Sequence, residues 1–374
     1  MKNHWEYLLP FSPDTSGFCC VVSGTDGCGI IDDPQGCVTN YLIYEEDRKL
    51  PQRVFHSQLC NMDVIFGSEE KLVNRYEAAA SLSPSFALLG GSPVSALIGT
   101  DITAAARMLK RRYRVPCAAV ELTGDRFYHE GIRNTCLALA ELLFGKNPVV
   151  PDRIPGSVNL LGTAPLDIGI FGAAAAKEAA LKEYSSVLSV WGGTGEGSAW
   201  QDLQKAGAAE WNLVLCADAV PLAEKLKAFF GTPWKRYFPF QPEASPLLKE
   251  DLNADLRCLI IGEPFLSRGI QTVLSKAFPG EVKTASFFSG TDEDTDVPLK
   301  DESDLRVLLD CAAWDLAVAD SAFQSFPGMP EHFVPLVHRA VSGLLYTGQA
   351  PEYPDECFWD SLLNKLRMTA KACK

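Results

Sequence analysis

The sequence lacks the motifs by which many enzymes are recognised. It contains no G-x-x-x-x-G-K-[ST] phosphate loop, so we expect that this chain binds and hydrolyses no nucleotide itself. It has no G-x-S-x-G nucleophile elbow, and its 5 histidines form no H-E-x-x-H or other zinc spacing. These absences argue against a hydrolase of the common serine or zinc types.

Long apolar runs and an excess of positive charge are also missing. No run of about 18 apolar residues occurs, so we expect no membrane-spanning helix. The first residues include Pro10 and polar side chains where a signal peptide has its apolar core, so we expect a cytoplasmic protein without a leader. The formal net charge of −13 at pH 7 argues against nucleic acid or an anionic membrane as a partner.

Cysteine, by contrast, is abundant, with 12 residues in the chain. Many cysteines without a secretory leader indicate a reducing compartment, where thiols serve metals or redox chemistry. Cys20, Cys37 and Cys60 lie beside Gly, Pro or Ser, and Cys60 is expected on the turn before a strand at Asp63–Gly67. Cysteines on such turns can bring several thiolates to one point, as an iron–sulfur cluster requires.

Most of the other cysteines and the histidines fit structural roles. Four cysteines lie among apolar neighbours and are interpreted as small core residues: Cys117, Cys136, Cys258 and Cys311. Cys28, in a Gly-Cys-Gly turn, stays a reserve ligand. Cys216 ends an apolar strand, so both a buried core position and a pocket-facing thiol remain open. His129 and His338 are interpreted as packing or capping residues, with a functional role left open.

The spacing of apolar segments predicts an α/β protein. Short apolar strands, such as those expected at Val158–Leu161, Asp167–Phe171 and Asn212–Cys216, alternate with helices along the chain. This alternation is typical of parallel sheets covered by helices on both faces, and 374 residues exceed what one core holds. Ligands of such sheets bind beyond the carboxyl ends of the strands. The glycine-rich loop Gly192–Gly197 is interpreted as a structural turn, because Ser198 takes the place of the third glycine of a dinucleotide fingerprint.

Five segments, in order along the chain, resemble motifs of the nitrogenase component 1 superfamily of oxidoreductases. They are Asp33–Cys37 (similar to H-G-P-x-G-C), Met62–Leu72 (similar to E-x-D-V-V-F-G-G-E-x-K-L), Ala96–Ile102 (similar to L-I-G-D-D-I), Val158–Gly162 (similar to v-N-l-i-G) and Gly231–Trp234 (similar to G-i-P-w). The resemblance implies three Rossmann-like domains, each a parallel β-sheet flanked by helices. We expect a cysteine-rich head with the first domain at 1–146, the second domain at 147–250, the third at 251–335 and a helical tail at 336–374.

The resemblance also implies an iron–sulfur cluster, expected to be [4Fe–4S], near a subunit interface. By position, Cys37 matches a family ligand and Cys20 falls near the one that precedes it. Ser92 and Pro93 stand where the family has its third cysteine, so Cys60 is the expected replacement. Cys216 corresponds to the cysteine that holds the catalytic cofactor in the nitrogenase α subunit.

The function implied is that of a nitrogenase-like component 1 subunit of an anaerobe. It would form a homodimer, or a heterodimer with a related subunit, and receive low-potential electrons from an ATP-dependent iron protein. Its substrate would be a small molecule or a tetrapyrrole-like compound. Two alternatives stay open: a non-catalytic scaffold or carrier for metallocofactor assembly, and a family member that has lost its cluster and binds a small molecule.

Overall fold

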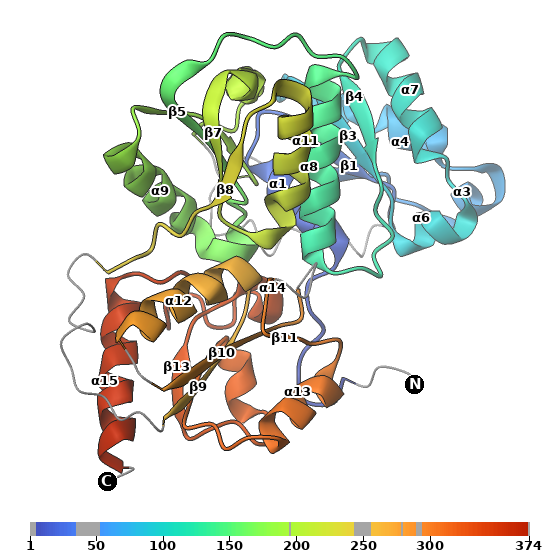
Figure 1. Ribbon diagram of the computed structural model, residues 1–374. Coiled ribbons are helices and arrows are strands. Elements are labelled where there is room, and N and C mark those ends of the chain that lie inside the picture. Colours follow the sequence, from blue (N-terminus) through green and yellow to red (C-terminus); the bar gives the residue numbers. More distant parts are fainter. Residues whose placement is uncertain are drawn as a thin grey trace.

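The structure is a computed structural model that describes residues 5–34, 53–193, 196–242, 256–277, 280–288 and 294–372. It contains three parallel β-sheets flanked by helices, which confirms the predicted fold class. The first two sheets lie side by side in the upper part of Figure 1, and the third lies below them. No helix in the described ranges is both long and apolar enough to cross a membrane.

The first sheet has the strand order β2-β1-β3-β4. Its strands are β1 (Cys28–Ile31), β2 (Val54–His56), β3 (Ala87–Gly90) and β4 (Cys117–Val120). Its helices are α1 (Asp14–Ser23), α3 (Asn61–Phe66), α4 (Glu69–Asn74), α5 (Tyr76–Ala80), α6 (Pro93–Ile98), α7 (Ile102–Tyr113) and α8 (Tyr128–Phe144). The central strands β1 and β3 are buried along their whole length. The apolar sequence of β3 predicts this burial, whereas Cys28, which was expected on a turn, is the first residue of β1.

The second sheet has the order β6-β5-β7-β8. Its strands are β5 (Ile154–Leu161), β6 (Ser186–Trp191), β7 (Ala209–Val214) and β8 (Trp234–Arg236). It carries the helices α9 (Pro165–Glu183), α10 (Trp200–Leu203) and α11 (Val220–Phe230), with a 3₁₀ turn η3 (Ala217–Ala219) after β7. Helix α8 packs on α1 and α11 and so joins the first two sheets.

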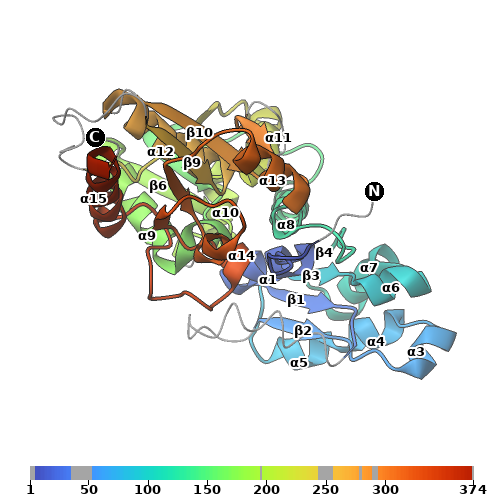
Figure 2. The ribbon, with the colours of Figure 1, turned by 90° about the horizontal axis from the view of Figure 1, so that it is seen from below.

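The third sheet has the order β11-β10-β9-β12-β13. Its strands are β9 (Arg257–Ile261), β10 (Glu281–Ser286), β11 (Val297–Pro298), β12 (Leu316–Ala319) and β13 (His332–Pro335). Its helices are α12 (Pro264–Ala277), α13 (Glu302–Asp310), α14 (Arg339–Ser342) and α15 (Glu356–Ala372). Figure 2 shows α14 beside α1, where the third sheet meets the other two.

The carboxyl ends of strands from all three sheets meet in the largest apolar cluster. The last residues of seven strands belong to it: Ile31, Val120, Leu161, Trp191, Val214, Ile261 and Ala319. Phe11 lies in the same cluster and contacts Phe127, Phe287 and Phe323, so aromatic rings fill the junction. The carboxyl ends of strands from all three sheets therefore face one common interior.

Two segments that we expected to be strands are helical. Asp63–Gly67 lies in α3, because the Asp63 carboxylate accepts the backbone N–H of Cys60 at 2.7 Å and caps the first turn. Asp167–Phe171 lies in α9, where Pro165 occupies the first turn without losing a hydrogen bond. The helix bends at Gly169, where φ is +67°, so the alternating apolar pattern belongs to a bent helix start.

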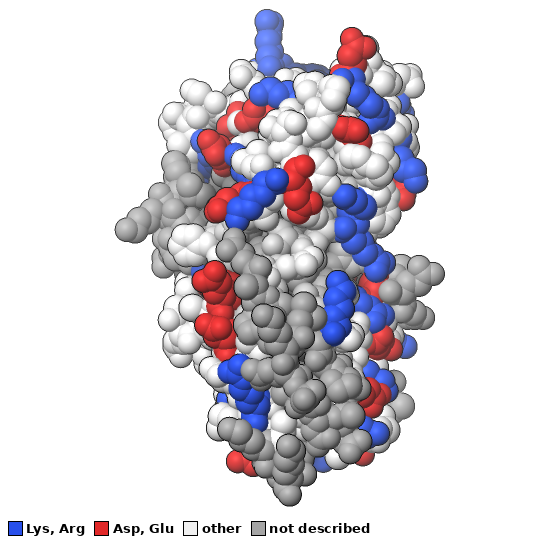
Figure 3. Space-filling model, turned by 60° about the vertical axis from the view of Figure 1, so that its left-hand side comes forward, with Lys and Arg blue, Asp and Glu red and all other residues white. Residues whose placement is uncertain are grey.

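The charged side chains are mixed over the face shown in Figure 3. Lysine and arginine alternate there with aspartate and glutamate, and the described residues of this face form no large area of one sign. The net charge of −13 is therefore not gathered on this side.

Candidate functional site

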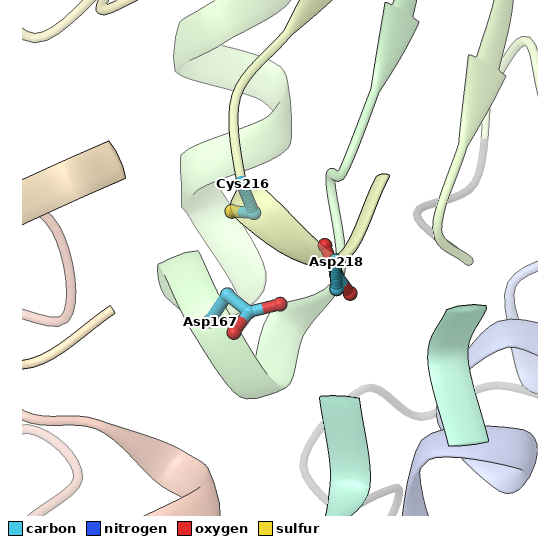
Figure 4. Close-up of side chains that lie close together, drawn as sticks. All are labelled: Asp167, Cys216 and Asp218. Carbon is cyan, nitrogen blue, oxygen red and sulfur yellow. The ribbon is translucent and has the colours of Figure 1, made fainter. Parts of the chain in front are cut away.

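The junction of the three sheets holds a cluster of buried ionisable side chains. Cys216 follows β7, Asp218 lies in η3, and Asp167 lies in the first turn of α9 after β5. One ligand atom from each, the Cys216 sulfur and one carboxylate oxygen of each aspartate, lies within 4.8 Å of the other two. Figure 4 shows these side chains grouped around one space between the start of α9 and the segment after β7.

The backbone at the end of β5 makes room for Cys216. Gly162 has φ of +79°, and a side chain there would meet the backbone nitrogen of Cys216 at 2.8 Å. Only glycine combines this backbone conformation with such a close approach. The thiol is fully buried, and burial among Glu263, Asp167 and Asp218 raises the pKa of Cys216 well above its usual range.

Asp167 and Asp218 are buried acids that have no cationic partner at hydrogen-bond distance among the residues that the structure describes. Asp167 is 2% exposed and Asp218 is 9% exposed. Burial, with the charge of Glu263, raises the pKa of Asp218 to about 8. Burial, with the charge of Asp218, raises the pKa of Asp167 well above its ordinary range. Asp218 therefore holds its proton at neutral pH in the absence of a bound cation.

Glu263 follows β9 and brings a third buried carboxyl group to the junction. Its two oxygens accept the backbone N–H groups of Ala217 and Leu266, each at 2.7 Å. The carboxyl group thus links the segment after β7 to the first turn of α12. Burial, with the charge of Asp167, raises the pKa of Glu263 to about 8 despite these hydrogen bonds.

Tyr128 connects Asp167 to His338. Its hydroxyl donates to Asp167 Oδ1 at 2.5 Å and lies 3.2 Å from His338 Nε2. With the hydroxyl proton on the Asp167 side, the Tyr128 oxygen accepts a hydrogen bond from Nε2 of His338 in the tautomer that carries its proton there. Burial lowers the pKa of His338 to about 3, so the imidazole is neutral. Its ring stacks on Phe288 at 5.1 Å, and Asp320 accepts its backbone N–H at 2.7 Å.

This arrangement suits two kinds of chemistry. A row of proton-bearing groups, from His338 through Tyr128 to Asp167, can hold and move protons in an enclosed space. Carboxylates and a thiolate are also ligands for a metal cation, which would replace their protons. The residues that could hold a metal or cofactor are thus Asp167, Cys216 and Asp218.

The predicted cluster ligands of the head lie in different surroundings. Cys60 is exposed at the start of α3, with its sulfur 3.8 Å from the Lys71 ammonium. It directly follows Leu59, which pairs with Pro34 beyond the ends of β2 and β1. Cys37 lies outside the described residues; Pro34, three residues before it in the sequence, is the last described residue of that segment.

Cys20 lies elsewhere, in the second half of α1, and is 1% exposed in the apolar cluster. The residue of α1 at the edge of the first sheet is Asp14, which accepts the N–H groups of Thr123 and Gly124 after β4. Cys20 is six residues further along, or about 9 Å along the helix axis. Among the residues described, neither Cys20 nor Cys60 joins a group of three possible metal ligands.

Ser92 and Gly193, which lie in two other segments singled out in the sequence, have structural roles. Ser92, which stands where the family has a cysteine, donates to the backbone oxygen of Asp32 and caps α6. In the Gly192–Gly197 loop, the backbone of Gly193 lies against α1, where an added side chain would meet the oxygen of Cys20 at 2.1 Å. This close contact gives the loop a packing role.

Sequence reasoning missed Asp167, Asp218, Glu263 and Tyr128 as members of one site. Each of the three acids follows the end of a strand, at β5, β7 and β9. The rule that ligands bind beyond the carboxyl ends of parallel strands could have singled them out. Asp167 was hidden because its segment was interpreted as a strand.

Comparisons with known proteins agree with this architecture. The sequence profile of a family described as nitrogenase component 1 type oxidoreductase matches residues 16–258. No curated protein sequence is significantly similar to the chain.

Two solved structures of nitrogenase Cp1 have a similar fold. The first, at pH 6.5, has 13% sequence identity and a TM-score of 0.73, over 98% of this chain and 94% of that chain. The second, at pH 5, has 18% identity and a TM-score of 0.70, over 98% of this chain and 90% of that chain. Because the family profile covers more than half of the sequence, the chain belongs to the family of nitrogenase component 1 type oxidoreductases.

Proposed function

We propose that the chain is the substrate-binding subunit of a nitrogenase-like reductase. It would receive low-potential electrons from an ATP-dependent iron protein and reduce a small-molecule or tetrapyrrole-like substrate. The observation that carries this proposal is the junction where Asp167, Cys216 and Asp218 gather at the strand ends of an oxidoreductase fold. The twelve cysteines of the chain support a location in a reducing compartment, for which we propose the cytoplasm.

The residues of the junction would supply protons during the reduction. Each electron pair added to a substrate requires protons, and an enclosed site must deliver them from its own groups. Asp218 and Glu263, whose pKa values are raised to about 8, hold protons at neutral pH. Tyr128 would hold Asp167 in place in this site through the hydrogen bond from its hydroxyl.

We further propose that the head holds an iron–sulfur cluster, through Cys37, Cys60 and Cys20, with a fourth ligand from a partner subunit, an acidic side chain or solvent. When bound, the cluster would supply one-electron chemistry at low potential. The pairing of Leu59, the neighbour of Cys60, with Pro34, three residues before Cys37 in the sequence, supports the first two ligands. The burial of Cys20 in α1 makes it the ligand that most needs a test.

Exposed apolar side chains support a protein partner at the head. Ile65 and Phe66 of α3 are 71% and 77% exposed, and Leu97 of α6 is 88% exposed. Both helices lie at the same end of the molecule in Figures 1 and 2. Beside α6, a hollow of about 440 Å³ opens at the ends of β3 and β4. Monomeric proteins rarely expose so many large apolar residues together, so we propose that the dimer partner or the iron protein binds here.

The decisive experiment is anaerobic purification with analysis of iron, acid-labile sulfide and electron paramagnetic resonance. We expect iron and sulfide in the wild-type chain and their loss in Cys37→Ser and Cys60→Ser. Serine keeps the start of α3 intact, because its hydroxyl is a better helix cap than the thiol. Retention of the cluster in Cys20→Ser would remove that residue from the ligand set. Absence of iron and sulfide after anaerobic reconstitution would refute the cluster.

The scaffold or carrier alternative is favoured by the polarity of the junction, which offers three carboxyl groups and one thiol. Turnover with a reducing iron-protein partner separates the two functions. A reductase would form reduced product with a rate that falls in Asp167→Asn, whereas a carrier would bind the same compound without reducing it.

A further inference from the structure

The three side chains grouped at the junction have the geometry of an incomplete metal site. The Cys216 sulfur and one oxygen each of Asp167 and Asp218 lie within 4.8 Å of one another. Ligands around a tetrahedral zinc ion, with bonds of about 2.0–2.3 Å, are separated by roughly 3.3–3.8 Å. A shift of about one ångström would therefore close the group around an ion.

A second observation points to a missing cation. Asp167 Oδ2 and both carboxylate oxygens of Asp218 are buried and have no hydrogen-bond partner of good geometry among the described residues. Buried carboxylate oxygens without partners are costly, and a bound cation is one group that removes this cost.

The donor atoms select the kind of cation. A thiolate beside carboxylates suits borderline transition-metal ions such as zinc or ferrous iron, whereas magnesium and calcium prefer oxygen ligands alone. A cavity of about 10 Å³ beside Asp167 is lined also by Glu263 and His338, but not by Cys216 or Asp218. It offers about the space that one water molecule needs beside Asp167.

We propose that Asp167, Cys216 and Asp218 bind one zinc or ferrous ion. Binding forms bonds from the ion to the Cys216 sulfur and to one oxygen each of Asp167 and Asp218, and the protons that these three groups hold are released to solvent. Tyr128 is a positioning residue, since its hydroxyl fixes Asp167 Oδ1 and leaves Oδ2 to face the metal. The proposal deepens the proposed function, because it rests on the same junction and specifies a single-ion site there.

Cobalt(II) is a suitable probe, because it occupies zinc sites and has a visible spectrum. The full-length chain, treated with a chelator and free of sulfide, is titrated with Co²⁺ in the absence of any partner or reductant. We expect one Co²⁺ per chain and a sulfur-to-cobalt charge-transfer band in the near ultraviolet. Cys216→Ser should abolish this band, and Asp218→Asn should weaken binding by at least about tenfold. The buried but distant Cys258→Ser serves as the matched control and should behave like the wild type.

Folding is checked separately, because Asp218→Asn removes a buried acid. This variant should unfold at a higher temperature than the metal-free wild type and lose the rise in unfolding temperature that Zn²⁺ causes. An unchanged charge-transfer band in Cys216→Ser, or no cobalt binding by the folded wild type, would overturn the site. Stoichiometric sulfide bound through Cys216 would also overturn a single-ion site. Iron–sulfur content at the head and reductive turnover are measured independently, so either proposal can fail alone.

Discussion

Asp218 makes the stability of the metal-free protein depend on pH. Its pKa is raised from an ordinary value of 3.8 to about 8 by burial and by Glu263. The unfolded chain loses this proton near pH 4, whereas the folded chain keeps it to about pH 8. The contribution of Asp218 to the free energy of unfolding is therefore greatest below about pH 4. It falls as the pH rises from about 4 to about 8, and it is lowest above about pH 8.

Asp218→Asn should accordingly flatten this dependence. We expect the free energy of unfolding at pH 9 to rise by roughly 2–5 kcal/mol, because one unit of pKa corresponds to about 1.4 kcal/mol and the neighbouring acid Glu263 titrates with Asp218. Denaturant unfolding of the metal-free protein between pH 5 and pH 9 measures the effect. Asp360→Asn, an exposed site in α15, should change little. Equal pH profiles for both variants would contradict the burial argument.

Tyr128→Phe tests the hydrogen bonds at the centre of the junction. The change removes the hydroxyl that joins Asp167 to His338, and it leaves both groups buried without that partner. The free energy of unfolding should fall by about 1–3 kcal/mol. Tyr7→Phe is the control, because Tyr7 is 45% exposed. A loss no larger than that of the control would mean that the hydrogen bonds contribute little.

Helix α3 exposes its apolar side chains instead of packing them in the core. None of its residues is buried, although its sequence Asn61–Phe66 contains four large apolar side chains. The Asp63 carboxylate holds the helix in place through the Cys60 N–H and through an ion pair with Lys71 at 2.6 Å. The helix therefore presents its apolar residues without being stabilised by burying them.

Ile65→Ser combined with Phe66→Ser should weaken subunit association and leave the fold intact. Exposed substitutions usually change the free energy of unfolding by no more than about 0.5 kcal/mol, whereas buried interface anchors contribute about 2 kcal/mol or more to binding. Analytical ultracentrifugation and binding of the iron protein measure the result. Val307→Ser in α13 is the matched control, since Val307 is 61% exposed. Unchanged association in the double variant would place the partner elsewhere.

At the scale of the whole molecule, the segment before α1 ties the first sheet to the third. The buried Glu302 carboxylate, at the start of α13, accepts the backbone N–H groups of Glu6, Tyr7 and Leu8 at 2.6–3.1 Å. Further along, the backbone of Ser12 bonds to Ala340 and that of Asp14 to Arg126. The first residues described thus help to close the junction that holds the candidate site.

Glu302→Gln should loosen this connection. An amide keeps the shape of the side chain but loses the charge that strengthens three hydrogen bonds, so we expect a loss of about 1–3 kcal/mol in the free energy of unfolding. Cleavage before α1 by a nonspecific protease should also become faster. Glu331→Gln, at an exposed position, is the control. Equal cleavage rates in both variants would show that the carboxylate does not hold this segment.

The sequence alone determined the fold class and the family, because both depend on local signals that recur along the chain. Apolar strands such as Ala87–Gly90 and Val158–Leu161 are buried on both faces, so their composition is sufficient to identify them. The five ordered motifs led to the family that the profile match then showed. The short apolar segment 64–66 was wrongly predicted to be part of a strand. Composition does not reveal whether another strand lies alongside such a segment.

Only the tertiary structure decided which residues form the junction. Asp167, Cys216 and Glu263 follow three different strands and are about fifty residues apart in sequence, so no spacing pattern links them. Their unusual pKa values arise from burial against one another, which exists only when three sheets face a common interior. The same packing encloses Cys20 in α1, although its sequence neighbours resemble those of a turn. A residue's type suggests what chemistry it can perform, but burial and neighbours, which the fold supplies, decide what it does here.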